Sequence, residues 1–256
     1  MPTSPEDHDA LRARLEGSAA EVLLPPRIAG AVRFEELPAV RDLLALPGGP
    51  VLAVLATGDE VVVAPLVPGH GDVRRALAGD GAFAGIAEVV RRGDRIGRFV
   101  PTRYRTIPAT AGERPIEVDQ SNDSVVVGER VVVKLFPRTA PGPQPGIDLP
   151  AHLAEVGFDE TPAPYGALRW EPPDGEPVLL ATVAVYLPGA RDGWDRHLEL
   201  VLDAVDGGDD EPSLAAAELA GGLVARLHAA LASPSTVLGP TPVGEAGPSE
   251  VAAWRA

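Results

Sequence analysis

The spacing of hydrophobic residues divides the first hundred positions into short helices and strands. Apolar residues that recur every three or four positions predict helices, whereas unbroken or alternating apolar runs predict strands. Helical spacing is found at residues 9–22, 72–78 and 81–92. Apolar runs typical of strands are found at residues 29–34, 51–56, 61–67 and 95–100. A polar stretch separates the second and third of these runs and predicts a β-hairpin, so this part of the chain is expected to form a small α+β domain.

The remaining sequence predicts a second, β-rich section followed by helices. Apolar runs predict strands at residues 124–127, 130–136, 165–170 and 177–186, the first two joined as a hairpin at Gly128-Glu129. A helix is predicted between the two pairs of strands, at residues 148–156. Segments rich in alanine and leucine predict the final helices at residues 196–205 and 213–232, the second of them N-capped by Ser213. The polar, proline-interrupted stretch at 103–115 is typical of a boundary between domains.

The composition excludes several classes of function. The chain has 256 residues and a formal net charge of −15, which argues against nucleic acid and anionic membranes as partners, because both require clustered positive charge. The absence of cysteine excludes disulfides, thiolate catalysis and cysteine-ligated metals, and the histidine spacing predicts no zinc site. The polar N-terminus is unlike a signal peptide, and we expect no apolar segment of about 18 residues. A soluble, cytoplasmic protein is therefore expected.

Lysine is nearly absent from the chain. Lys134 is the only lysine among the 22 basic residues, and the other 21 are arginine. A lysine ammonium is a compact point charge, which an arginine does not replace where such a charge is needed. Period-two alternation places Val132, Lys134 and Phe136 on one face of the predicted strand. Two interpretations remain open: a ligand-binding lysine, or a charged residue that protects an edge strand against aggregation.

The elements around Lys134 follow the order found in the small lobe of a kinase. A polar loop at residues 119–124 precedes the hairpin, and its backbone N–H groups and hydroxyls suit phosphate oxygens. Lys134 lies on the second strand, beneath the first hairpin turn, where its ammonium is expected to meet the α- and β-phosphates of ATP. Such a lysine needs a carboxylate to orient it, and the following helix offers Asp148. Asp148 is equally well placed to cap its own helix, so its role stays open.

Several motifs resemble a known family. The segments QSNDSVVVG (120–128), VKLFPR (133–138) and PGPQP (141–145) resemble the maltokinases and the related glucosamine kinases. These enzymes have the aminoglycoside-phosphotransferase-like kinase fold. The segment YLPGARDGWD (186–195) resembles their interlobe hinge, which ends in the same DGWD run. The resemblance extends over nearly the whole chain.

The resemblance implies an α+β fold in three parts. Residues 1–108 correspond to a small N-terminal cap domain, and residues 109–190 to a kinase-like N-lobe made of an antiparallel sheet, a helix and the hinge. Residues 191–256 correspond to the first helices of an incomplete C-lobe. Kinases of this fold take the catalytic aspartate and the magnesium-binding aspartate from beyond the hinge, in a pattern resembling His-x-Asp-x-x-x-x-Asn. Nothing after Tyr186 matches that pattern, so no catalytic residue and no metal ligand is assigned in this chain.

The resemblance also implies which residues bind the nucleotide: Lys134, Ser121, Asn122, Ser124, Asp148, Val185 and Leu187. The lysine contacts the phosphates, and the two serines and the asparagine fall in the phosphate-binding loop. The valine and the leucine would offer backbone groups to the adenine. Asp148 stands where the family usually has glutamate as the partner of the lysine, and its side chain is shorter by one methylene.

The sequence therefore predicts the N-terminal part of an ATP-dependent sugar kinase. The full-length parent is expected to bind a nucleotide and a small sugar, with the ligands of Mg²⁺ and the catalytic aspartate outside this chain. By itself the chain is not expected to catalyse phosphoryl transfer. Two alternatives stay open: a kinase-like module that binds a nucleotide or a partner without turnover, and an α+β scaffold unrelated to kinases.

Overall fold

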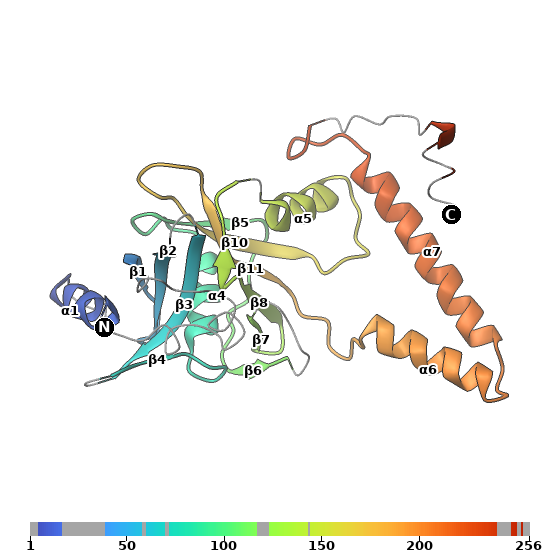
Figure 1. The fold of residues 1–256 in the computed structure, drawn as a ribbon, viewed down its shortest axis with the longest axis horizontal. Coiled ribbons are helices and arrows are strands. Elements are labelled where there is room, and N and C mark those ends of the chain that lie inside the picture. The colour runs from blue at the N-terminus through green and yellow to red at the C-terminus, as the bar shows by residue number, and fades with distance from the viewer. Residues whose placement is uncertain are drawn as a thin grey trace. The chain divides into compact units, whose positions relative to one another are not determined.

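The computed structural model describes residues 5–16, 39–57, 60–69, 72–116, 123–142, 144–239, 247–249 and 252, and Figure 1 shows them as a ribbon. The helices are α1 (Pro5–Glu16), α4 (Ala82–Arg92), α5 (Pro145–Glu155), α6 (Gly193–Val205) and α7 (Glu211–Leu231). The strands are β1 (Ala39–Ala45), β2 (Val51–Thr57), β3 (Glu60–Pro68), β4 (Val73–Arg75), β5 (Phe99–Arg103), β6 (Glu113–Pro115), β7 (Asp123–Val127), β8 (Val131–Leu135), β9 (Arg138–Thr139), β10 (Pro164–Trp170) and β11 (Val178–Val185). The chain divides into two compact units, one of residues 1–147 and 162–188, the other of residues 148–161 and 189–256.

The first sheet of the first unit is apolar on both faces. Its strands are antiparallel in the order β1-β2-β3-β4, and β9 also pairs with β3 (Figure 1). On β2, Val51, Ala53 and Leu55 enter a cluster that also contains two leucines of α1. The alternate residues Leu52 and Val54 enter the core around α4. Burial on both faces explains why the sequence here is an unbroken apolar run rather than an alternating one.

Helix α4 packs against strands of both sheets. The second sheet is antiparallel, in the order β5-β10-β11-β8-β7-β6. The helix contacts β3 of the first sheet and β5, β7, β8, β10 and β11 of the second. Its apolar stripe buries Phe83, Ile86 and Val90 in a core to which both sheets contribute. This helix therefore joins the two sheets into one hydrophobic core.

The N-terminus of α4 is capped from a distant strand. The helix begins after Gly81, which has no side chain to accept from the free N–H groups of the first turn. Glu113 on β6 supplies the acceptors: its Oε2 accepts from Gly79 and Gly81 at 2.8 and 3.0 Å, and its Oε1 accepts from Ala84 at 2.7 Å. The carboxylate also places negative charge at the positive end of the helix dipole. Strand β6 thus stabilises the start of α4.

The second unit consists of α6, α7 and most of α5. His152 of α5 is fully buried, with Nδ1 2.8 Å from the hydroxyl of Ser235 and Nε2 3.0 Å from the carbonyl oxygen of Ala230. Arg226 of α7 donates two hydrogen bonds of 2.7 Å to the carboxylate of Glu160. These contacts join α5 and the loop after it to the C-terminal part of α7 and the residues that follow.

Large apolar side chains on α6 and α7 are exposed. The exposed fraction is 77% for Trp194, 75% for Val205 and 70% for Leu219, and neither helix has a buried residue. By length and composition alone, α7 is also long and apolar enough to cross a membrane, with a mean hydropathy of 1.3. This differs from the expectation of no such segment, although a single helix of this kind is weak evidence for a membrane span.

Most predicted elements are confirmed. Both hairpins, the helix at 81–92 and the last two strands and helices are present within a few residues of the predicted bounds, and α5 begins at Pro145 rather than at Asp148. Helix α1 covers the first half of the predicted helix at 9–22, and residues 17–22 lie outside the described residues. The strand predicted at 29–34 also lies outside them.

The helix predicted at 72–78 is wrong. Residues of this segment form β4, in which Val73 and Arg75 pair with Pro68 and Leu66 of β3. Pairing with an existing strand satisfies backbone groups that a helix of two turns leaves unpaired at both ends. Ser213 is also not an N-cap, because α7 begins two residues earlier, at Glu211. The strands β1, β6 and β9 were not predicted.

The described elements confirm a mixed fold of helices and antiparallel sheets. Strand pairing crosses the predicted domain boundary at residue 108 in both sheets. β5 pairs with β10 in the second sheet, and β9 pairs with β3 in the first. The division into a cap domain, an N-lobe and the start of a C-lobe stays a prediction.

Glu113→Gln is expected to lower the free energy of unfolding by about 1–3 kcal/mol. The amide retains one acceptor but turns an NH₂ group toward backbone N–H donors, and it removes the charge at the helix terminus. Denaturant titration followed by circular dichroism measures the change. The control is Glu176→Gln, an exposed residue without a recorded side-chain partner among the described residues. Equal stability of the two variants would contradict the capping role.

Candidate functional site

Lys134 lies on a central strand of the second sheet. β8 has β11 on one side and β7 on the other, and Lys134 is in register with Thr182 and Ser124 on these neighbours. β8 is therefore not an edge strand, and the interpretation of Lys134 as a charged residue that protects an edge strand against aggregation is wrong. The predicted alternation is confirmed, since Val133 and Leu135 are buried while Lys134 is half-buried.

The ammonium group of Lys134 lies over an aromatic ring. Its Nζ is 5.6 Å from the centroid of the Phe136 ring, a cation–π distance. Both side chains therefore lie on the same side of the sheet, as the alternation predicts. The ring contributes apolar surface beside the charge, and a lysine ammonium carries three N–H donors.

The turn between β7 and β8 requires backbone conformations that glycine favours. Gly128 and Glu129 both have positive φ, at 59° and 52°, the combination of a type I′ hairpin turn. The N–H of Gly128 donates to the carbonyl oxygen of Gly112 at 2.9 Å. A Cβ at position 128 would lie 2.8 Å from the Cβ of Thr110. The hairpin tip is thus packed tightly against the segment that leads into β6.

An arginine links this turn to the hinge. Arg114 of β6 donates to both carboxylate oxygens of Glu129 at 2.5 and 2.9 Å and to the hydroxyl of Tyr186 at 2.6 Å. Its guanidinium also lies 5.1 Å from the centroid of the Tyr186 ring. The hydrogen bond from Arg114 holds the pKa of Glu129 below its ordinary value. One guanidinium therefore contacts the hairpin tip and the first residue of the predicted hinge.

A second arginine reaches a residue of the predicted phosphate-binding loop. Arg75 of β4 forms an ion pair with Asp123, the first residue of β7, and both side chains are largely buried. Ser121 and Asn122 lie outside the described residues, so their predicted roles are not tested. Ser124, the remaining predicted loop residue, is half-buried on β7.

The hinge residues differ in the availability of their backbone amides. The N–H of Val185 donates to the carbonyl oxygen of Ala163 at 3.0 Å, and the N–H of Tyr186 donates to that of Arg130 at 2.9 Å. Leu187 is 48% exposed, and the structure records no hydrogen bond of its backbone among the described residues. Of the two residues predicted to face adenine, Leu187 is therefore the one with a free N–H donor.

Asp148 lies in the first turn of α5 and is half-buried. It belongs to the second unit, whereas Lys134 belongs to the first. Its predicted pairing with Lys134 stays a prediction. Within the described part of the chain, no group of three or more metal-ligating side chains is found.

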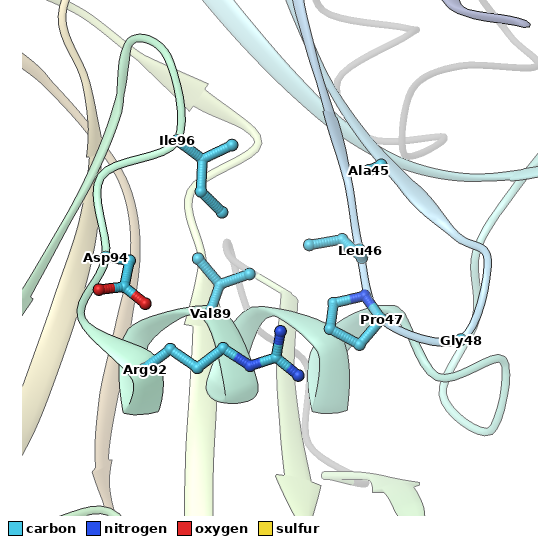
Figure 2. A pocket seen from close by; sticks show the side chains of 8 residues that line it. All are labelled: Ala45, Leu46, Pro47, Gly48, Val89, Arg92, Asp94 and Ile96. Atoms are coloured by element: carbon cyan, nitrogen blue, oxygen red, sulfur yellow. The ribbon is translucent and has the colours of Figure 1, made fainter. Parts of the chain in front are cut away.

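A cavity of about 500 Å³ opens elsewhere in the first unit, between the turn after β1 and the C-terminal end of α4 (Figure 2). Leu46, Val89 and Ile96 give it apolar walls, and Figure 2 shows the side chain of Arg92 extending along it. Arg92 is already paired with Glu88 at 2.7 Å. None of the predicted nucleotide-binding residues that the structure describes lines this cavity.

Comparison with known proteins relates the chain to sugar kinases. No protein-family model matches it. It is 40% identical over 244 residues to a glucosamine kinase of Streptacidiphilus jiangxiensis, which covers 92% of this chain and 51% of that protein. It is 37% identical over 196 residues to a glucosamine kinase of Mycolicibacterium smegmatis (strain ATCC 700084 / mc(2)155), which covers 75% of this chain and 48% of that protein. The chain thus spans about half the length of these relatives.

Solved structures give the same result. A glucosamine kinase in one crystal form superposes with a TM-score of 0.69 at 33% identity, over 95% of this chain and 55% of that one. A glucosamine kinase in complex with glucosamine, ADP and inorganic phosphate superposes with a TM-score of 0.66 at 33% identity, with the same coverage. The chain is similar to glucosamine kinases. The arrangement of helices and strands is therefore consistent with a kinase-like fold. The resemblance to maltokinases stays a prediction.

Gly128→Ala is expected to destabilise the protein by at least about 1–2 kcal/mol, because a side chain is strained at positive φ. The contact with Thr110 adds to this cost. The matched control is Gly221→Ala within α7, where the new Cβ meets no other atom within 4 Å and φ is not positive. Thermal melting compares the two variants, and an equal melting temperature would contradict the turn geometry.

Glu129→Gln is expected to lower the melting temperature at pH 7 and to lose this effect in acid. Because the pKa of Glu129 is lowered in the folded state, its pairing with Arg114 stabilises the fold above the ordinary carboxyl pKa of about 4.3. That contribution is lost as the pH falls through the lowered pKa. Melting curves of wild type and variant at falling pH measure the difference. A difference that stays constant with pH would count against the ion pair.

Proposed function

We propose that this chain supplies the nucleotide-binding part of an ATP-dependent sugar kinase of the glucosamine kinase type. The observation that carries the proposal is the position of the single lysine, on a central strand directly behind a rigid hairpin turn. The similarity to glucosamine kinases over half of their length supports it. A neighbour whose structure contains glucosamine, ADP and inorganic phosphate supports the substrate class.

In this proposal, Lys134 binds the α- and β-phosphates of ATP. Its ammonium is a point charge that can follow the phosphate oxygens, and it lies 5.6 Å from the centroid of the Phe136 ring. Ser121, Asn122 and Ser124 present hydroxyl, amide and backbone donors to the same phosphates. Asp123 between them is held by Arg75, which limits the movement of the loop at its junction with β7.

The adenine is held by the hinge. The N–H of Leu187 is a free donor, while the N–H of Val185 is already bonded to Ala163. Val185 therefore offers the adenine its backbone carbonyl oxygen rather than its N–H group. The clamp formed by Arg114 between Glu129 and Tyr186 fixes the distance from the phosphate end to the adenine end. The resemblance assigns Asp148 as the carboxylate partner of such a lysine.

The reaction transfers the γ-phosphoryl group of ATP to a sugar hydroxyl. Its transition state is loose, so catalysis depends on positioning and on neutralising the phosphate charge. Mg²⁺ supplies part of that neutralisation when bound, and its ligands and the aspartate base come from outside the residues of this chain. The work of this chain is to hold the nucleotide in place.

The exposed helices of the second unit support a division into lobes. Trp194, Val205 and Leu219 leave large apolar areas of α6 and α7 open to solvent. Apolar patches of this kind mark surfaces that contact other protein or a membrane, and we propose that other protein covers these. We assign residues 1–108 to a cap domain and 109–190 to the N-lobe with its hinge. Residues 191–256 then begin a helical lobe that further residues complete, in a soluble cytoplasmic enzyme.

Lys134→Met is expected to weaken ADP binding at least about ten-fold, because it removes charge-assisted hydrogen bonds to phosphate. Isothermal titration of the 256-residue chain measures the affinity. The control is Arg105→Met, which removes one positive charge from an exposed residue without a recorded side-chain contact among the described residues. Equal affinity of the two variants would contradict the role of Lys134.

A fusion separates the enzyme from the alternative of a binding module without turnover. The chain, alone and joined to the C-terminal half of the Streptacidiphilus jiangxiensis relative, is incubated with ATP, Mg²⁺ and glucosamine. If the fusion forms phosphorylated glucosamine and the chain by itself does not, the result supports the kinase hypothesis. ADP binding by the fusion without any transfer supports the binding module.

A further inference from the structure

A second cavity of the first unit is lined by three arginines. It measures about 740 Å³ and lies among α1, β1 and the turn that joins β10 to β11. Arg12 comes from α1, Arg41 from β1, and Arg98 from the segment just before β5. Elements far apart in the sequence therefore bring three guanidinium groups to one opening, in a chain whose net charge is −15.

No ion pair of these three arginines is recorded within the part of the chain that the structure describes. Neither Arg41 nor Arg98 has a side-chain hydrogen bond or ion pair recorded among the described residues, and both are exposed. Arg12 donates to the carbonyl oxygen of Val40, which carries no charge. Asp174 is the single carboxylate among the described residues that line the cavity. Positive charges that converge without compensation repel one another, and a bound anion removes that repulsion.

The floor and walls of the cavity are apolar and rigid. Trp170 and Val178 are buried beneath it, and Pro172 and Pro173 form one wall. The indole Nε1 of Trp170 donates to Asp42 at 3.0 Å, which fixes the ring. The two prolines are at least partly exposed and suit the C–H face of a small ring, and the volume is typical of cavities that bind small molecules.

We propose that this cavity binds a sugar phosphate, with the phosphate held by Arg41 and Arg98 and the sugar ring against Pro172 and Pro173. Guanidinium groups bind phosphate through paired, charge-assisted hydrogen bonds. Asp174 lies on the same lining and can accept from an ammonium group, which selects an amino-sugar phosphate. The anion site rests on the arginines alone, whereas the choice of an amino sugar rests on the proposed function.

This cavity is separate from the proposed nucleotide site. None of the five described residues assigned to the nucleotide lines it. Strand β11 begins at the cavity with Val178 and ends at the hinge with Val185. A phosphorylated sugar bound here would therefore occupy a second site on the sheet that carries Lys134.

Calorimetric titration of the 256-residue chain with glucosamine 6-phosphate tests the proposal. We expect saturable binding of one molecule, weakened about ten-fold by either Arg41→Gln or Arg98→Gln, and weakened by added salt. Arg105→Gln, an exposed arginine outside the cavity, is the matched control and is expected to leave binding unchanged. Both cavity arginines are exposed, so circular dichroism should show intact folding. Absence of binding, or equal effects of all three variants, would overturn the proposal.

Titrations with other ligands test the anion site, the sugar contact and the role of Asp174 separately. Glucosamine without phosphate is expected not to bind, and binding equal to that of the phosphate ester would overturn the anion site. Asp174→Asn is expected to remove the preference for glucosamine 6-phosphate over glucose 6-phosphate, and an unchanged preference overturns the role of Asp174. Inorganic phosphate that binds as tightly as the ester would overturn the sugar part.

The variant Lys134→Met distinguishes this inference from the proposed function. It is expected to lose ADP binding while glucosamine 6-phosphate still binds. Loss of both ligands would place the sugar phosphate at the nucleotide site and overturn the inference. If the wild-type chain instead binds the sugar phosphate through the two arginines and fails to bind ADP, that result would refute the proposed nucleotide site and support the second cavity as a binding site.

Discussion

The fold depends on the burial of α4 against two sheets at once. The helix supplies Phe83, Ile86 and Val90 to a core that neither sheet closes alone, and hydrophobic burial of this kind is the main favourable term in folding. Its N-terminus is stabilised by Glu113, which belongs to β6. β6 in turn pairs with β7 beside the lysine-bearing strand. The geometry around Lys134 on β8 is therefore connected to α4 through β6 and β7, although no sequence motif links Lys134 to that helix.

The sequence predicts the elements whose pattern is local and misses those that depend on distant partners. The runs at 51–56 and 61–67 predict their hairpin because the turn is adjacent to both strands. The segment around Val73 has apolar residues at helical spacing, yet β3 offers it an unpaired edge. A capping glutamate 29 residues from the amide of Ala84 leaves no local signal either. Tertiary contacts decide such cases, and a single sequence does not display them.

The candidate site divides in the same way. Period-two alternation correctly predicts that Lys134 and Phe136 share a face, but whether the strand is central or at an edge depends on the order of the sheet. The resemblance names Val185 and Leu187 together, and only the structure shows that the first amide is already bonded. Arg75 and Arg114 have no motif, and the sequence analysis did not select them. Their side chains contact residues distant in the sequence, Asp123 for Arg75 and Tyr186 for Arg114, and these contacts become visible only in the structure.

The two-sided burial of β2 and β3 has a consequence for the fidelity of folding. In a sheet with one wet face, slipping a strand by one residue exposes its apolar side chains, and this penalty selects the correct pairing. Here a slipped β2 would still present apolar side chains to both cores, because Val51 through Leu55 are all buried. The correct alignment must then come from the closure of the hairpin, where Thr57 pairs with Glu60. Lengthening that connection would therefore promote misaligned, aggregation-prone states before it affected the native contacts.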